Sequence, residues 1–231
     1  MPNVLITGAN RGIGLELARQ YREAGWRVIA TCRHPAEATD LQDLAHSGNI
    51  SIYRLDVTSV DDIYDIAWQI RDTAVDVLLN NAGIYLEWNY LGPELGAIRY
   101  DDWMRTIEVN TFGAVRLTEK LFPNVKKSDR RLVATITSHM GSISDIDSPG
   151  SYYYRSSKAA LNAAMQGLAK ALSHHGIGVL LLHPGGVKTR MGPSDGISAE
   201  ESVQGMRRII EAFDIADTGS FIRFDGTVMP W

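Results

Sequence analysis

Short apolar runs alternate with amphipathic segments along the chain. The apolar runs are rich in aliphatic and β-branched residues and lie near 4–7, 27–31, 50–55, 75–79, 131–137, 177–182 and 220–224. Between them, apolar residues recur with the three-to-four-residue spacing of a helix, near 13–24, 36–46, 60–72, 100–122, 151–175 and 199–214. Length and periodicity together predict a strand in each run and a helix in each segment.

This alternation predicts the fold class. Strands that are apolar throughout are buried on both faces, as in parallel sheets, and parallel neighbours need the crossovers that the helices supply. We therefore expect an α/β protein with a doubly wound, Rossmann-type parallel sheet of about seven strands, flanked by helices on both faces. The chain has 231 residues without an evident repeat or linker, so we expect one domain over 1–231. Ligands of such sheets bind beyond the carboxyl ends of the strands.

Composition and charge narrow the function classes. Hydrophobic residues make up 45% of the chain and charged residues 22%, which is typical of globular proteins. The net charge is −4 and the 23 basic residues are scattered, which favours neither nucleic acid nor a membrane as partner. The single cysteine, Cys32, excludes an internal disulfide, and no metal site is indicated. No charged leader precedes the first strand, so we expect a cytoplasmic protein that acts on small molecules.

A glycine-rich turn, TGANRGIG at 7–14, links the first strand to the first helix. Glycines let the backbone turn tightly and approach a pyrophosphate, whose charge the helix N-terminus stabilises. The GxxxGxG spacing differs from the GxGxxG dinucleotide fingerprint, so a simple turn is the alternative for this motif alone. The candidate cofactor-binding residues here are Gly8, Asn10, Arg11, Gly12, Ile13 and Gly14.

The end of the second strand favours NADP over NAD. An NAD-binding unit carries an acidic residue there, which accepts a hydrogen bond from the ribose 2′-hydroxyl. Here the strand ends in Thr31-Cys32-Arg33, without a carboxylate. We expect Arg33 and Arg11 to converge on a 2′-phosphate, and two solvated surface arginines are the alternative.

Two further strand ends suit a nucleotide. Asp56 and Val57 follow the third strand, where a carboxylate and a backbone amide could meet the adenine edge. Asn80, Ala82 and Gly83 follow the fourth strand in the sequence NNAG at 80–83. Taken as isolated turns, these segments would indicate little.

Polar residues interrupt two apolar helix stripes. Tyr154 and Lys158 lie on the inward stripe of the helix predicted over 151–175, where a lysine needs a functional or structural reason. Asn110 interrupts the inward stripe of the helix predicted over 100–122, and a buried, hydrogen-bonded structural asparagine is the alternative there. Ser138 follows the fifth strand, where its hydroxyl would reach the same crevice.

Taken in order along the chain, these residues resemble the short-chain dehydrogenase/reductase family in its single-domain branch. The resemblance runs from Val4 to Thr189 and rests on TGANRGIG, Asp56 with Val57, NNAG, Asn110, Ser138, YRSSK at 154–158 and Pro184-Gly185 with Thr189. The TCR ending of the second strand, SHMGSI at 138–143 and the closing Met229-Pro230-Trp231 look like the sniffer and C-factor group of carbonyl reductases. The resemblance implies NADP(H) as cofactor and a carbonyl or alcohol as substrate, and it adds to the cofactor-binding residues Tyr154, Lys158, Pro184, Gly185, Val187 and Thr189.

The resemblance also implies catalytic roles. Tyr154 would protonate the carbonyl oxygen while the nicotinamide delivers hydride, and Ser138 would hydrogen-bond the substrate oxygen. Lys158 would lower the phenol pKa and hold the nicotinamide ribose, and Asn110 would hold a water that links Lys158 to solvent. Lowering a tyrosine pKa from about 10 to near 7 takes roughly 4 kcal/mol, which one cation about 4 Å away supplies at an effective dielectric constant of about 20.

Departures from the family pattern leave some roles open. The stretch between Ser138 and Tyr154 is longer than usual, so Ser142 is an alternative for the serine role. Tyr152 and Tyr153 adjoin the expected acid, but neither has a lysine four residues on. We expect the pocket entrance to be formed by Met140, Tyr85 and residues 189–192, whose apolar groups predict broad recognition of small to medium apolar or aromatic carbonyls.

The sequence raises two other function classes, a serine hydrolase and a non-catalytic binding protein. GPSDG at 192–196 matches the GxSxG motif of serine hydrolases, but all six histidines precede Ser194, whereas the hydrolase histidine follows its serine. A non-catalytic NADP-binding protein that signals or senses redox state remains the alternative, since fold does not fix function. The sequence also leaves a homo-oligomer open.

Overall fold

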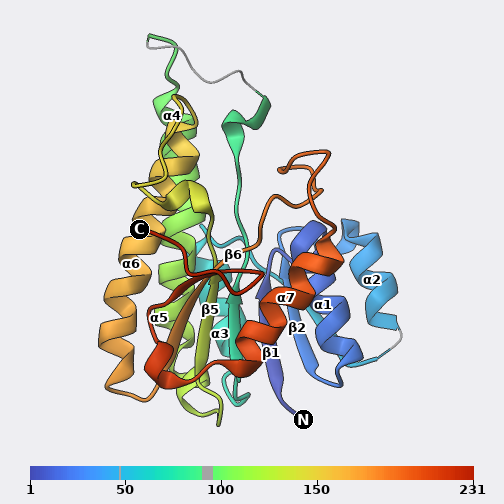
Figure 1. The fold of residues 1–231 in the computed structure, drawn as a ribbon. Helices are drawn as coiled ribbons and strands as arrows, with labels where there is room; N and C mark the ends of the chain where they lie inside the picture. The colour runs from blue at the N-terminus through green and yellow to red at the C-terminus, as the bar shows by residue number, and fades with distance from the viewer. Residues whose placement is uncertain (47, 90–95) are drawn as a thin grey trace.

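A seven-stranded parallel sheet forms the centre of the computed structural model, which describes residues 1–46, 48–89 and 96–231 (Figure 1). The strand order in this part of the chain is β3-β2-β1-β4-β5-β6-β7, and each pair of neighbours is parallel. The predicted doubly wound fold is therefore confirmed. The strands are β1 (Asn3–Thr7), β2 (Arg27–Cys32), β3 (Ile50–Arg54), β4 (Val77–Asn80), β5 (Leu132–Ile136), β6 (Gly178–His183) and β7 (Phe221–Arg223).

Helices cover both faces of the sheet because successive strand side chains point to opposite sides. Val4 and Ile6 belong to one buried cluster and Leu5 to another. The first cluster includes side chains of α1 (Gly12–Glu23), α2 (Thr39–His46) and α7 (Ala199–Ala212). The second includes side chains of α3 (Val60–Gln69), α5 (Gly113–Lys126) and α6 (Tyr152–Ser173). The helix α4 (Tyr100–Ile107) lies beside the first turns of α6, beyond the sheet (Figure 1).

The prediction of a single helix over 100–122 is wrong in one respect. A π-helical turn, η3 (Glu108–Phe112), separates α4 from α5, and α5 continues to Lys126. The turn directs two side chains toward α6: Thr111 Oγ1 donates to the Ser157 carbonyl oxygen at 2.8 Å, and Asn110 Nδ2 donates to Ser157 Oγ at 3.0 Å. Such π turns inside helices are frequent at functional sites, and amphipathic periodicity does not reveal them.

Candidate active site

The glycine turn lies at the carboxyl end of β1, next to the start of α1. Gly8 and Gly12 have φ values of +65° and +54°, a region that side-chain-bearing residues rarely adopt. A Cβ at Gly14 would lie 2.2 Å from the Gly8 carbonyl oxygen, so only glycine allows this close approach. Arg11 at the helix N-cap makes no capping bond, and the first turn of α1 holds no acidic residue. The N–H groups at this end are therefore available to an anion.

The amide that braces this turn is Asn81, which the sequence analysis did not single out. Asn81 Nδ2 donates to the Thr7 carbonyl oxygen at 2.8 Å, and the backbone N–H groups of Asn81 and Ala82 donate to Thr7 Oγ1 at 2.9 Å. The side chain of Asn80 instead turns toward α5, where its Nδ2 donates to Thr118 Oγ1 at 3.0 Å. The NNAG motif carried the signal but did not say which amide faces the turn. A cofactor contact of Asn80 stays a prediction.

We expect Gly14→Ala to destabilise the protein by about 1–3 kcal/mol and to weaken NADPH binding, because the new methyl group collides with backbone that cannot move aside. Chemical unfolding and fluorescence titration with NADPH measure the two effects. Gly167→Ala in α6 is the matched control, since nothing lies within 4 Å of a Cβ there. That change should stabilise the helix by roughly 0.5–1 kcal/mol. A Gly14→Ala variant as stable as wild type, with unchanged NADPH affinity, would contradict the packing argument.

Three arginines meet beside the turn. Arg11, Arg33 and Arg190 line a cavity of about 370 Å³. None of them forms an ion pair with a carboxylate among the residues that the structure describes. Arg190, which the sequence analysis missed, comes from the segment between β6 and α7, which rises toward α1 and α2 (Figure 1). The other lining residues are Asn10, His34, Glu37, Ala38, Thr39 and Asp40.

Asp56 and Val57 lie at the carboxyl end of β3. Burial raises the pKa of Asp56, but hydrogen bonds from Thr58 and the charges of Arg105 and Arg33 outweigh it and hold the pKa below its ordinary value. Asp56 is therefore a carboxylate at neutral pH. Val57 packs over the start of α5, where a Cβ at Gly113 would come within 2.7 Å of Val57 Cγ2.

The residues implied after β6 surround the other side of the turn. Thr189 lies next to Gly12, where a Cβ would be 3.5 Å from Thr189 Cγ2. Val187 is buried, and Gly185 has a φ of +82°. The Pro184 carbonyl oxygen accepts a hydrogen bond from Ser202 Oγ of α7 at 2.6 Å. The strand end and this segment are thus held against α7, with Thr189 facing the glycine turn.

Tyr154 lies in the first turn of α6, and its phenol is close enough to the Ser138 hydroxyl, which follows β5, for that hydroxyl to lower its pKa. Burial raises the pKa of Tyr154 to about 12, although the Ser138 hydroxyl lowers it; neighbouring Tyr85 raises it further. The sequence predicts that Lys158 lowers this pKa, but in the structure the pKa is raised because burial dominates. The phenol is protonated at neutral pH, as a proton donor must be.

Lys158 is buried on the inward stripe of α6, as the stripe pattern predicted, and only 4% of it is exposed. Its Nζ donates to the Ile136 carbonyl oxygen at 2.9 Å and lies 5.7 Å from the centre of the Tyr154 ring. Burial lowers the pKa of Lys158 to about 8, so the side chain is mostly, but not fully, protonated at neutral pH. Its ammonium therefore reaches both β5 and the neighbourhood of the phenol.

Asn110 lies beside this pair and is 1% exposed. A Cβ at Gly83 would lie 3.3 Å from Asn110 Oδ1 and 3.8 Å from Lys158 Nζ, so the two side chains meet at Gly83. Asn110 Oδ1 accepts from the Ile84 N–H at 2.8 Å, and its Nδ2 donates to the Ile84 carbonyl oxygen at 2.9 Å. The amide thus links the segment after β4 to α6. Its role in holding a water stays a prediction.

The candidate serines Ser138 and Ser142 have different partners in the structure, and Tyr153, which adjoins Tyr154, has a partner of its own. Ser138 reaches Tyr154, whereas the Ser142 hydroxyl hydrogen-bonds Ser144 at 3.1 Å. The Tyr153 hydroxyl is buried and accepts from the Arg99 N–H at 2.6 Å. Of the two serines, Ser138 is the one brought to the phenol.

A segment after β4 reaches the start of α6. The Tyr85 ring stacks on the Tyr154 ring, with centroids 4.3 Å apart and an interplanar angle of 18°. Glu87, in the short helix η2 (Leu86–Asn89), is buried, and its Oε2 accepts from the Tyr154 N–H at 2.8 Å. Sequence reasoning missed Glu87, because nothing local links it to a helix that begins 65 residues later, at Tyr152.

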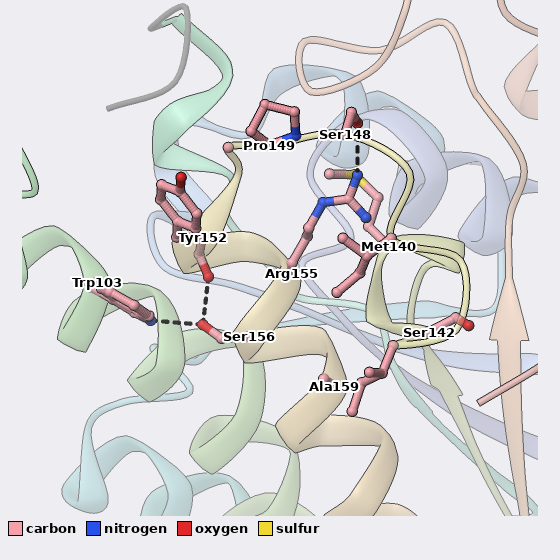
Figure 2. A pocket seen from close by; sticks show the side chains of 12 residues that line it. Trp103, Met140, Ser142, Ser148, Pro149, Tyr152, Arg155, Ser156 and Ala159 are labelled. Carbon is pink, nitrogen blue, oxygen red and sulfur yellow. Dashed lines mark hydrogen bonds between the residues drawn. The ribbon is translucent and has the colours of Figure 1, made fainter. Parts of the chain in front are cut away.

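A second cavity, of about 450 Å³, lies along α6 but is not lined by Tyr154 or Lys158 (Figure 2). Its polar groups bond one another: Trp103 Nε1 donates to Ser156 Oγ at 2.7 Å, and Ser156 Oγ donates to the Tyr152 carbonyl oxygen at 2.6 Å. Met140 lines this cavity, whereas Tyr85 and residues 189–192 do not. This cavity therefore brings together only one of the three expected entrance segments, and the entrance formed by all three stays a prediction. The other lining residues are Ser142, Ile143, Ile146, Ser148, Pro149, Gly150, Arg155 and Ala159.

Other kinds of site are not apparent in the described ranges. They contain no cluster of three or more histidine, cysteine or acidic side chains that could hold a metal ion. Within the same ranges, every helix is too short or too polar to cross a bilayer.

Comparison with known proteins identifies the class. Residues 2–198 match the family model described as short chain dehydrogenase, and the chain belongs to this family of oxidoreductases. The C-signal of Myxococcus xanthus is 40% identical over 158 residues, which cover 68% of this chain and 93% of that protein. The structure of the carbonyl reductase Sniffer of D. melanogaster is 32% identical, with a TM-score of 0.92 over 100% of both chains. An NADPH-bound carbonyl reductase from chicken fatty liver is 31% identical, with a TM-score of 0.91 over 100% of this chain and 99% of that one.

These similarities confirm the family and the carbonyl-reductase-like group that the sequence motifs indicated.

Proposed function

We propose that this protein reduces small carbonyl compounds to alcohols with NADPH, and that Tyr154 is the proton donor. The observation that carries the proposal is the buried Lys158 ammonium 5.7 Å from the Tyr154 ring, together with the Ser138 hydroxyl that acts on the same phenol. Ser138 follows β5, and Lys158 Nζ lies beside Gly83, which follows β4. A protonated phenol, a second hydroxyl and a cation are the groups that polarise and protonate a carbonyl oxygen.

The residues present fit a dinucleotide with a 2′-phosphate. The turn at Gly14 leaves no room for a side chain, and the uncapped start of α1 offers N–H groups to a pyrophosphate. Arg11, Arg33 and Arg190 would hold the 2′-phosphate, since they share one cavity and lack carboxylate partners among the described residues. Asp56 and Val57 would contact the adenine. Gly83, Lys158 and Thr189 would border the nicotinamide end.

The reduction balances with one hydride and one proton. When bound, NADPH supplies the hydride to the carbonyl carbon and leaves as NADP⁺. Tyr154 gives its phenolic proton to the carbonyl oxygen as the C=O π bond is replaced by C–H and O–H bonds. Ser138 donates a hydrogen bond to the same oxygen and holds it near the phenol. Lys158 stabilises the tyrosinate left behind, until a proton from solvent restores the phenol.

We propose small to medium apolar or aromatic carbonyls as the substrate class. The Tyr85 ring, which stacks on the Tyr154 ring, forms an aromatic wall beside the phenol. The polar groups proposed to contact the substrate, Tyr154 and Ser138, both bind its carbonyl oxygen. A site that recognises shape and apolar area discriminates poorly, because one methylene changes binding by only about 1–3 kcal/mol. Activity should therefore spread over several neutral substrates.

The test is consumption of NADPH by the purified protein with a panel of aldehydes, ketones and quinones. We expect kcat/KM values for neutral aromatic carbonyls to exceed those for charged ones. Activity confined to one charged metabolite, with neutral aromatic ketones and aldehydes inert, would show the substrate proposal to be wrong.

Binding without turnover is the second candidate function. The observation that favours it is the 40% identity with a protein named C-signal. In that case NADPH would bind with normal affinity and no member of the carbonyl panel would be reduced. The same panel therefore separates the two candidates.

A further inference from the structure

We infer that Glu87 is a positioning residue for Tyr154: its buried carboxylate fixes the first turn of α6 and thereby the place of the phenol beside Ser138. The inference rests on the proposed function, because it concerns the residue proposed to donate the proton.

The first turn of α6 has no cap of its own. Ser151, at the N-cap, has a φ of +53° and its side chain accepts no hydrogen bond from the helix. Glu87 takes its place from a distant part of the chain, with Oε2 2.8 Å from the Tyr154 nitrogen. The N–H groups of Tyr153 and Tyr152 also act on the charge of this carboxylate, whereas its Oε1 has no hydrogen-bond partner among the described residues. One side chain therefore binds the Tyr154 N–H and places a carboxylate at the start of the helix that carries Tyr154 and Lys158.

The burial of Glu87 indicates a role beyond capping. Only 2% of the residue is exposed, and a carboxylate taken out of water is costly unless its partners compensate. Burial raises the pKa of Glu87, while the three N–H groups lower it. A serine or aspartate at the N-cap would satisfy the helix end with less desolvation. An ordinary N-cap residue would not connect residues 85–87 to the first turn of α6, which carries Tyr154.

The same segment also holds the side chain of Tyr154. The Tyr85 ring stacks on the Tyr154 ring at 4.3 Å, and the Tyr85 hydroxyl hydrogen-bonds Ser151 Oγ. Glu87 thus fixes the backbone of Tyr154 while Tyr85 fixes its ring. Misplacement of a reacting group by about 1 Å can lower the rate by about 10²-fold. Glu87 interacts with the first turn of α6 and not with the glycine turn in the part of the chain that the structure describes, so cofactor affinity should not depend on it.

The experiment compares Glu87→Ala and Glu87→Gln with Ser198→Ala. Ser198 Oγ accepts from the Glu201 N–H at 3.0 Å and so caps α7, a helix that contributes no proposed catalytic residue. We measure kcat with saturating NADPH, the NADPH Kd by fluorescence, and the thermal midpoint. Glu87→Ala should lower kcat by at least about tenfold with Kd unchanged within about twofold. Glu87→Gln should lose less, because its amide oxygen still accepts one N–H. Ser198→Ala should lower the midpoint and leave kcat at the wild-type value.

A double-mutant cycle with Tyr154→Phe separates this inference from the proposed function. If Glu87 acts through Tyr154, Glu87→Ala should cause no further loss of turnover in the Tyr154→Phe background. Wild-type kcat in Glu87→Ala, or a full additional loss in the double variant, overturns the inference while Tyr154→Phe alone still supports the proposed function. Full activity of Tyr154→Phe overturns both. Should Glu87→Ala not fold, Glu87→Leu decides, because leucine fills the space but accepts no N–H: a kcat equal to wild type overturns the inference.

Discussion

Replacing Tyr154 with phenylalanine should lower carbonyl turnover by at least about 10²-fold, the typical contribution of a general acid. The substitution keeps the ring that stacks on Tyr85 and removes only the hydroxyl near Ser138. NADPH binding should persist, since the glycine turn and the arginine cavity are untouched. Steady-state kinetics give the turnover, and fluorescence titration gives the Kd for NADPH.

Tyr152→Phe is the matched control for this experiment. Tyr152 lies two residues away on α6 and lines the cavity of about 450 Å³, which Tyr154 does not line (Figure 2). Its hydroxyl should be dispensable, so turnover should stay at the wild-type value. An equal loss in Tyr152→Phe, or retained activity in Tyr154→Phe, would assign proton donation to another group.

The second large effect concerns the cofactor. Arg33→Asp should reduce NADPH affinity by roughly tenfold to 150-fold, since a hydrogen bond to a charged group is worth about 1.5–3 kcal/mol. The new carboxylate stands where NAD-binding units place an acid for the ribose 2′-hydroxyl, so NADH affinity should rise. Titration of the wild-type protein and Arg33→Asp with NADPH and with NADH measures the change in cofactor preference.

Arg27→Asp makes the same change of charge at the opposite end of β2. Arg27 is exposed and does not line the arginine cavity, so its substitution should leave both affinities unchanged. Equal affinity of the wild-type protein for NADH and NADPH would refute the NADP preference.

Local patterns were enough to predict the architecture. Fully apolar strands alternating with amphipathic helices specify a parallel sheet, and the glycine turn after β1 falls where such a sheet binds ligands. The inward stripes also placed Lys158 and Asn110 correctly, since both are buried. These features depend on residues close together in the sequence, or on periodicity within one helix.

What the sequence did not reveal depends on contacts between distant segments. Glu87 caps a helix that begins at Tyr152, and Arg190 reaches the cavity of Arg11 and Arg33 from the far end of the chain. The choice between Asn80 and Asn81 depends on which face of the strand end each occupies. The direction of the Tyr154 pKa shift depends on the degree of burial, which no motif encodes.

The central claim is that this chain converts a carbonyl to an alcohol at the expense of NADPH. The most direct measurement quantifies both compounds in one reaction: NADPH by its absorbance and the alcohol by chromatography, with wild-type protein and Tyr154→Phe side by side. We predict one alcohol formed for each NADPH consumed by the wild type, and at least about 10²-fold slower formation by Tyr154→Phe. NADPH binding by both proteins with no alcohol from either would contradict the claim and favour binding without turnover.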